Sequence, residues 1–240
     1  MSGGRPARRK SSPGRFVRDI VVIFMAALLI SFLIKTFLVR SFYIPSGSME
    51  NTLQINDRII VNELVPRAIG LQRGDVVVFT DPGGWLSGTE QISTATGNPV
   101  VDGVRWFLTQ VGLGTQDSND HLIKRVIGLP GDKVACCNAF GQMEVNGVPL
   151  KETYLDLPAG VTRVSQDDFS VTVPAGELWV MGDNRYNSAD SRYNRDKPHG
   201  GFVPISDVVG RAVVVSWPTN HWNWLGNYPD VFAGTGKENG

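Results

Sequence analysis

The segment Pro45-Ser46-Gly47-Ser48-Met49 has residue types that can hold a small nucleophile in a turn. Pro45 fixes its own backbone φ angle, and Gly47 permits backbone conformations that other residues avoid. Such a turn can direct the Ser48 hydroxyl outward and leave backbone N–H groups free to face a substrate. Because a hydroxyl is a weak nucleophile until a base removes its proton, the segment predicts nucleophilic chemistry only if the chain also supplies a base.

Lys124 is the candidate base. The chain has three histidines but no Gly-x-Ser-x-Gly elbow, and no lysine stands three residues after Ser48. Lys124 lies between Ile123 and the apolar pair Val126-Ile127, in a run typical of a strand, whose neighbouring side chains point to opposite faces. If Lys124 points inward, Arg125 is therefore expected to point outward. Burial would lower the lysine pKa from about 10.4 toward neutrality, whereas a solvated edge lysine is the commoner alternative.

The N-terminal part of the chain predicts a membrane anchor. The whole chain carries 23 basic and 23 acidic residues, a balance that gives no reason to expect a nucleic-acid partner. Residues 1–18 are basic and rich in Gly, Pro and Ser, and are predicted to be a disordered cytoplasmic tail. Residues 19–39 are almost continuously apolar and long enough to cross about 30 Å of hydrocarbon. The basic flank predicts a cytoplasmic N-terminus, with residues 40–240 on the other side of the plasma membrane.

Two alternatives to a retained anchor are weaker. A cleaved signal peptide has a shorter apolar run and small residues at its cleavage site, whereas here Lys35 and the residues to Arg40 follow the run without a small-x-small pair. A buried core helix would show a polar face, which the run lacks.

Beyond Leu53 the pattern becomes that of short β-strands separated by Gly- and Pro-rich turns. The β-branched runs lie at residues 58–61, 75–79, 121–128, 169–173, 177–181 and 210–217. An Asn-Gly pair at 146–147 also predicts a hairpin. The expected fold is mainly β, an antiparallel sandwich or barrel-like catalytic body after a single N-terminal transmembrane helix. Residues 80–120 are read as a loop-rich insertion.

The remaining unusual residues leave alternatives open. Cys136 and Cys137 are adjacent and are the only cysteines; two free thiols are expected, with a vicinal disulfide as the alternative. Ligands with zinc spacing are absent, so neither a metal nor a cofactor is expected. Trp217, Trp222 and Trp224 fit either a core or a lipid interface, where tryptophan is enriched.

Four sequence boxes, in this order, resemble those of bacterial type I signal peptidases, the leader peptidases of the serine-lysine dyad family. The boxes cover residues 45–49, 73–77, 124–132 and 182–192. The resemblance implies a membrane-bound serine endopeptidase that cleaves N-terminal signal peptides from exported preproteins after small residues. Ser48 would be its nucleophile and Lys124 its general base.

The resemblance also implies roles for the polar residues around this pair. The Ser46 hydroxyl and the Ser48 backbone N–H would form the oxyanion hole, and Ser188 would hydrogen-bond and orient Lys124. Asp190 and Arg192 would support the site through an ion pair. Tyr186 stands where the family commonly has an acidic residue, and residues 194–200 look inserted, so the loop around this ion pair is the part that the resemblance describes least well.

Apolar residues around the dyad are the expected substrate-binding surface. They are Phe42, Ile44, Pro45, Met49, Leu53 and Ile123. Family resemblance implies two shallow pockets, one for the residue just before the cut and one for the residue two further back, and hence a preference for Ala-x-Ala. An extended substrate could add as a strand beside residues 42–46 and 121–124. The implied partners are preproteins, membrane lipid and, as a further candidate, the secretion translocon.

Two other functions fit parts of the sequence. A self-cleaving Ser-Lys protease of the repressor type would have a related β fold, but such proteins are cytoplasmic and carry a DNA-binding domain, which the apolar anchor argues against. An inactive, membrane-tethered β scaffold would tolerate replacement of Ser48 and Lys124.

Overall fold

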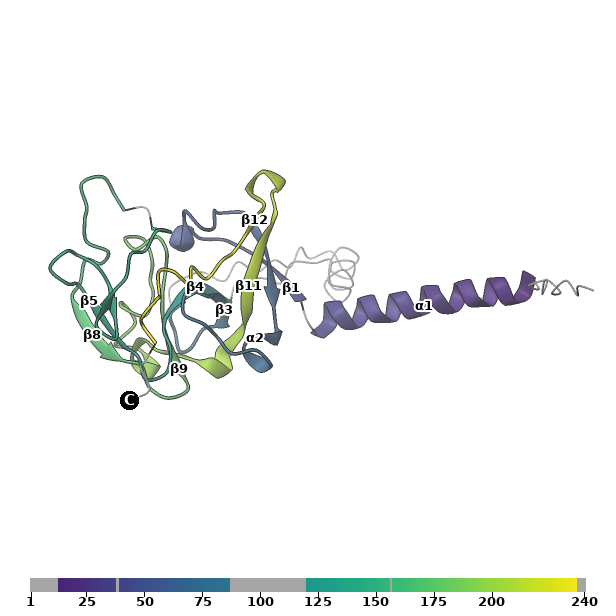
Figure 1. The fold of residues 1–240 in the computed structure, drawn as a ribbon, viewed down its shortest axis with the longest axis horizontal. Coiled ribbons are helices and arrows are strands. Elements are labelled where there is room, and N and C mark those ends of the chain that lie inside the picture. The colour runs from purple at the N-terminus through teal and green to yellow at the C-terminus, as the bar shows by residue number, and fades with distance from the viewer. Residues whose placement is uncertain (1–12, 38, 87–119, 156, 237–240) are drawn as a thin grey trace, which may run out of the picture.

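The computed structural model describes residues 13–37, 39–86, 120–155 and 157–236, with a long N-terminal helix projecting from a β-rich body (Figure 1). The predicted insertion at 80–120 lies mostly outside these ranges. Helix α1 (Pro13–Phe37) begins within the predicted disordered tail, because Pro13 suits the first helical turn. Val39, placed in the anchor by the sequence, instead begins β1. Within the described ranges, no helix has the combined length and apolarity required to span a bilayer.

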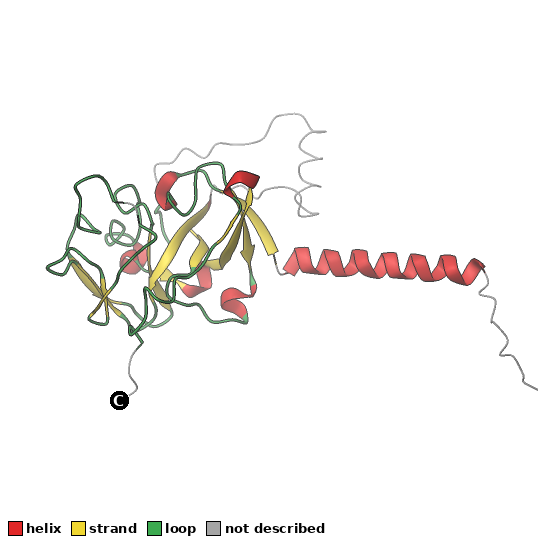
Figure 2. Cartoon of the chain, turned by 45° about the horizontal axis from the view of Figure 1, so that its top comes forward, coloured by secondary structure: helices red, strands yellow, loops and turns green. Residues whose placement is uncertain are grey.

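Two antiparallel sheets form the body, which confirms the predicted mainly β class. The larger sheet has the order β1 (Val39–Tyr43), β2 (Arg58–Asn62), β11 (Val208–Trp217), β3 (Val76–Thr80), β4 (His121–Gly128), β9 (Glu177–Met181) and β10 (Val203–Pro204), with β12 (Asn223–Trp224) on β11. The smaller has the order β7 (Val148–Pro149), β6 (Glu144–Val145), β5 (Lys133–Cys136) and β8 (Phe169–Thr172). Long loops join the strands (Figure 2).

Short helical turns occupy several of these connections. They are η1 (Gly47–Met49), α2 (Leu64–Arg67), η3 (Pro198–Gly201), η4 (Ile205–Asp207) and η5 (Thr219–His221). The predicted hairpin at 146–147 is confirmed: Asn146 and Gly147 join β6 to β7 with φ angles of 54° and 80°. A two-residue turn of this hand needs positive φ at both positions, which Asn and Gly tolerate best.

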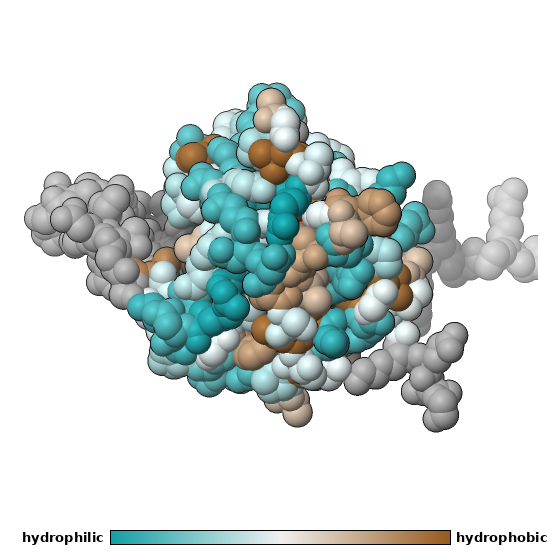
Figure 3. Space-filling view, turned by 90° about the vertical axis from the view of Figure 1, so that its left-hand side faces the viewer, coloured by the Kyte–Doolittle hydropathy of each residue, from teal (hydrophilic) through white to brown (hydrophobic). Residues whose placement is uncertain are grey.

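Apolar side chains fill the space within and between the sheets. One cluster gathers Phe42, Ile44, Met49 and Leu53 beneath the nucleophile turn. A second surrounds Trp179, which is fully buried. The face of the body turned away from α1 is mostly hydrophilic, with apolar residues in small groups (Figure 3). The segment that carries Ser48 therefore packs on a buried apolar cluster.

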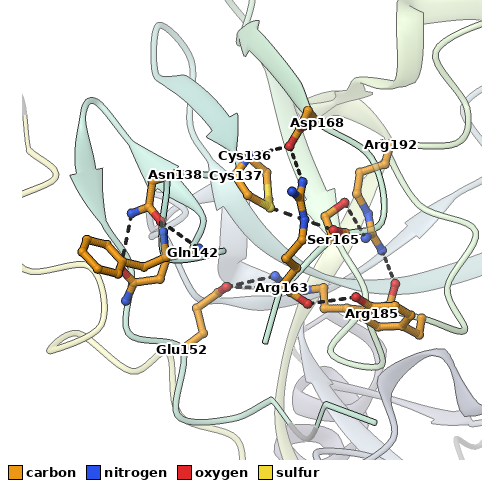
Figure 4. The surroundings of a disulfide bond; sticks show 12 residues. Cys136, Cys137, Asn138, Gln142, Glu152, Arg163, Ser165, Asp168, Arg185 and Arg192 are labelled. Carbon is orange, nitrogen blue, oxygen red and sulfur yellow. Dashed lines mark hydrogen bonds and ion pairs between the residues drawn. A yellow bond between two sulfur atoms is a disulfide. The ribbon is translucent and has the colours of Figure 1, made fainter. Parts of the chain in front are cut away.

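The structure corrects one expectation about unusual residues and excludes one of two open alternatives for others. Cys136 and Cys137 form a disulfide rather than two free thiols (Figure 4). Strand β5 ends at Cys136, so the alternation that would separate the two side chains stops there, and the peptide bond between them is cis. Trp217, Trp222 and Trp224 are all more than half exposed, which excludes the core as their place.

Candidate active site

The nucleophile turn follows directly from the sheet. Beyond β1, Ile44 continues the pairing with the loop before β2: its N–H donates to the Asp57 carbonyl, and its own carbonyl accepts from Asn56, both at 2.9 Å. The short helix η1 then begins at Gly47 and carries Ser48. Gly47 is not among the residues with positive φ. A Cβ there would lie 2.7 Å from the Glu50 carboxylate carbon, so a larger residue would displace the Glu50 side chain.

Lys124 and Ser48 meet in a buried contact between β4 and η1. Lys124 Nζ donates to Ser48 Oγ at 2.7 Å and to the Ile123 carbonyl at 2.9 Å. The exposed fractions are 3% for Lys124 and 7% for Ser48. Burial lowers the pKa of Lys124 to about 8, although the nearby charges of Asp190 and Asp183 oppose the shift. An amine with this pKa can be neutral near physiological pH and take the serine proton.

Arg125 is buried, so the prediction that it points outward is wrong. The sheet is covered on both faces at this point, and the Arg125 side chain has no exposed surface. Its guanidinium makes a bidentate ion pair with Asp183 at 2.6 and 2.8 Å and lies over the rings of Tyr154 and Tyr228. The C-terminal segment that carries Tyr228 thus covers the face opposite Lys124.

The ion pair between Asp190 and Arg192 is present and fully buried. Arg192 Nε and Nη2 donate to the two Asp190 carboxylate oxygens at 2.9 and 2.8 Å. Burial by itself would raise the pKa of Asp190, but Arg192, the Gly182 N–H and Lys124 together keep it below its usual value. Arg192 Nη1 also donates to Ser165, beside the disulfide (Figure 4). Asp190 in turn accepts from the Gly182 N–H at 3.0 Å. This hydrogen bond links the ion pair to the backbone at Gly182.

Ser188 lies close to the dyad without the expected hydrogen bond. Its hydroxyl is buried and has no hydrogen-bond partner in the described part of the chain, because Lys124 Nζ is directed to Ser48 and to its own strand. Ser188 Oγ and the Ser48 carbonyl oxygen would lie 2.2 and 2.4 Å from a Cβ placed on Gly182. Glycine is therefore required at position 182, because any side chain there would collide with Ser188 and with the backbone at Ser48.

The other predicted residues are divided between surface and core. Ser46 and Pro45 are exposed at the start of the turn, and the Ser46 side chain caps no helical N–H. The apolar members of the predicted substrate surface are buried together in one cluster: Phe42, Ile44, Met49, Leu53 and Ile123. The oxyanion role of Ser46 and contact between these side chains and a substrate stay predictions.

Two strand edges lie side by side next to the dyad. In the described ranges β1 pairs only with β2, and residues 121–124 of β4 pair only with β3, because β9 joins β4 from Arg125 onward. The rings of Phe42 on β1 and His121 on β4 have centroids 5.2 Å apart. Backbone groups in residues 41–43 of β1 and 121–124 of β4 are therefore placed to pair with an added extended segment.

Sequence reasoning gave no role to Asn184, which the structure places against the nucleophile turn. Its backbone N–H donates to the Ser48 carbonyl at 3.1 Å, and its side-chain amide donates to the Gly47 carbonyl and to Glu50 at 3.1 and 2.9 Å. Asn184 lies in the fourth sequence box, which was the only signal that could have identified it.

Comparison with known proteins places these features in a family. The model of the family described as signal peptidase, peptidase S26, matches residues 17–217. A signal peptidase I of Mycobacterium tuberculosis is 38% identical, over 91% of this chain and 76% of that protein. A probable signal peptidase I of Mycobacterium leprae is 39% identical, over 87% and 79%.

Among solved structures, a signal peptidase I from Enterococcus faecalis V583 is 27% identical, over 59% of this chain and 95% of that chain, with a TM-score of 0.36. That score is too low to compare the two folds. The match of the family model to most of the chain, together with the identity to the mycobacterial proteins, is decisive. The chain belongs to the signal peptidase family S26.

Proposed function

We propose that this protein is a membrane-bound signal peptidase I that cleaves signal peptides from exported preproteins with Ser48 as nucleophile and Lys124 as general base. The observation that carries the proposal is the buried 2.7 Å contact between Lys124 Nζ and Ser48 Oγ. Family membership gives the substrate class. A lysine with a lowered pKa gives a base that works near neutral pH.

The reaction proceeds through an acyl-enzyme. Neutral Lys124 takes the proton from Ser48 Oγ as the oxygen attacks the scissile carbonyl carbon. The Ser48 N–H and the Ser46 hydroxyl donate to the oxyanion. Protonated Lys124 then gives its proton to the leaving amine, and the signal peptide stays bound as an ester of Ser48. Lys124 next deprotonates a water molecule, which hydrolyses the ester and restores the serine. Buried Asp190 and Arg192 hold the loop beside the dyad.

The signal peptide binds as an added strand between residues 41–43 of β1 and residues 121–124 of β4. Backbone hydrogen bonds to both edges would give affinity, and alternate side chains would enter pockets above the buried cluster around Ile44 and Met49. Small side chains fit such shallow pockets, whereas a charged group would be buried there without a partner. Ala-x-Ala before the cut is therefore the preferred sequence.

Helix α1 anchors the enzyme in the plasma membrane. Its large apolar side chains between Phe16 and Ile30 are exposed along the helix, and the preceding residues are basic. In this arrangement residues 1–18 include the cytoplasmic tail, and residues 19–37, the rest of α1, are the span. The catalytic body, which begins with β1 at Val39, lies outside the cytoplasm. The three exposed tryptophans between 217 and 224 would contact the lipid interface, near preproteins delivered by the translocon.

Cleavage of a preprotein by the purified full chain in detergent tests the proposal. Wild type should release the mature protein, and Ser48→Ala should not. Ser170→Ala, at an exposed position of β8, is the matched control and should cleave like wild type. Undiminished cleavage by Ser48→Ala would refute Ser48 as the nucleophile.

A peptide series tests the pocket model separately. Only the residue before the cut is varied, and the preceding sequence is kept constant. Ala, Gly and Ser should be cleaved, whereas Leu, Phe and Lys should not. Equal rates across the series would refute shallow pockets while leaving the dyad intact.

Protease treatment of spheroplasts tests the topology. The catalytic body should be digested from outside, leaving a short protected N-terminal fragment. Complete protection of the body would contradict the proposed orientation.

A further inference from the structure

A surface concavity lies directly after the nucleophile in the chain. It has a volume of about 420 Å³ and is lined by Glu50, Asn51, Gln54 and Ile55. The first of these residues follows Ser48 by two positions, and the lining is polar except for the exposed Ile55. The buried apolar cluster assigned to the signal-peptide side includes none of them.

The loop that forms the concavity has a fixed shape. The backbone N–H groups of Thr52 and Leu53 donate to the Met49 carbonyl at 3.0 and 2.8 Å. The Gln54 N–H donates to the Asp57 carboxylate at 2.8 Å. Leu53 is fully buried and fastens the loop to the core. The concavity is therefore a preformed feature of the surface.

Glu50 is held at a fixed position relative to Ser48. Its carboxylate accepts from the Asn184 amide at 2.9 Å and packs against Gly47. Asn184 also donates its backbone N–H to the Ser48 carbonyl. No ion pair joins Glu50 to a basic residue within the part of the chain that the structure describes. The concavity thus presents a negative charge that its own surroundings leave uncompensated.

The direction of the strands indicates which part of a substrate reaches this loop. Strands β1 and β4 both run toward the dyad, ending near Ser48 and passing through Lys124. If the residues before the cut run parallel to these strands, the residues after it continue beyond Ser48, and residues 50–55 follow Ser48 directly in the chain. The occupant of the concavity is then the N-terminal end of the mature protein.

We propose that the concavity is the subsite for the first residues of the mature protein and that Glu50 makes it favour basic over acidic residues there. This inference rests on the proposed signal peptidase activity and adds a second determinant of specificity to it. An opposite charge near Glu50 is attracted, and a like charge is repelled. Because the site is open to water, the effect on kcat/KM should be modest, roughly three- to fivefold between Lys and Glu.

Three peptides with the same Ala-x-Ala segment test the inference. They differ only in the first residue after the cut, which is Lys, Gln or Glu. Wild type should cleave the Lys peptide roughly three- to fivefold more efficiently than the Glu peptide. Glu50→Gln should bring this ratio close to one, because the amide removes the charge and still accepts from Asn184. Glu144→Gln, on the smaller sheet, is the matched control and should keep the wild-type ratio.

The outcomes distinguish failure of the proposed subsite from failure of the proposed peptidase activity. A wild-type ratio of one, or the same ratio in wild type and Glu50→Gln, would overturn the subsite while the Gln peptide is still cleaved. The Gln peptide also reports whether Glu50→Gln is folded and active. No cleavage of any peptide by wild type would refute the proposed activity itself, and the subsite with it.

Discussion

Replacing Lys124 by Met should change how the stability of the protein depends on pH. Lys124 binds its proton with a pKa lowered to about 8 by burial, from the value of 10.5 for a free side chain. At pH 7 both the folded and the unfolded chain carry the proton, and burial of the charge disfavours the folded state. At about 1.36 kcal/mol per pKa unit, the lowered pKa reduces the free energy of unfolding at pH 7 by about 3 kcal/mol.

The destabilisation of the folded state by protonated Lys124 should decrease between pH 8 and pH 10.5. Above pH 8 the folded protein releases its proton, whereas the unfolded chain keeps it until about pH 10.5, so wild-type stability gains from Lys124 as the pH rises. Met carries no proton in either state. Titration of Lys124 makes the free energy of unfolding of Lys124→Met exceed that of wild type by about 3 kcal/mol at pH 7. This part of the difference should therefore fall to about 2 kcal/mol at pH 9. Loss of the lysine hydrogen bonds adds an offset that does not change over this range.

Urea unfolding of the full chain in detergent, followed by tryptophan fluorescence at pH 7, 8 and 9, measures this difference. Lys133→Met, at an exposed position of β5, is the control for loss of a positive charge as such. A difference between Lys124→Met and wild type that stays constant from pH 7 to pH 9 would refute a buried lysine with a lowered pKa.

Three further predictions concern the surroundings of the dyad and the second apolar cluster. Asp190→Asn should lower the apparent pKa in the pH–rate profile, because the Asp190 charge stabilises protonated Lys124; an upward shift would contradict this. Gly182→Ala should abolish cleavage of a peptide substrate, since its Cβ would collide with the Ser48 carbonyl, whereas Gly226→Ala, with open space around it, should remain active. Trp179→Ala should lower the free energy of unfolding by about 3–5 kcal/mol in urea titrations, and a loss below about 1 kcal/mol would argue against its place in the core.

Local features of the fold could be predicted from the sequence because they depend on neighbouring residues. Short β-branched runs gave the positions of β2, β3, β4 and β9, and the Asn-Gly pair gave the hairpin between β6 and β7. The order of the strands could not be predicted. β2 pairs with β11, which lies some 150 residues later in the chain. Alternation along a strand does not tell which strands meet.

The same distinction applies to the candidate site. Ser48 and Lys124 could be identified from their sequence boxes, but the burial of Arg125 depends on Asp183, Tyr154 and the C-terminal segment, which reach it from distant parts of the chain. A strand covered on both faces has no outward side. Alternation alone therefore gave the wrong environment for Arg125.

The pH dependence of kcat/KM for a peptide with Ala-x-Ala before the cut tests the central claim most directly. If neutral Lys124 activates Ser48, kcat/KM should rise about tenfold per pH unit below the pKa of about 8 and level off above it. Lys124→Arg should show no such rise, because its guanidinium keeps the proton throughout the range. An optimum near pH 5 for wild type, or substantial activity of Lys124→Arg, would contradict a lysine base.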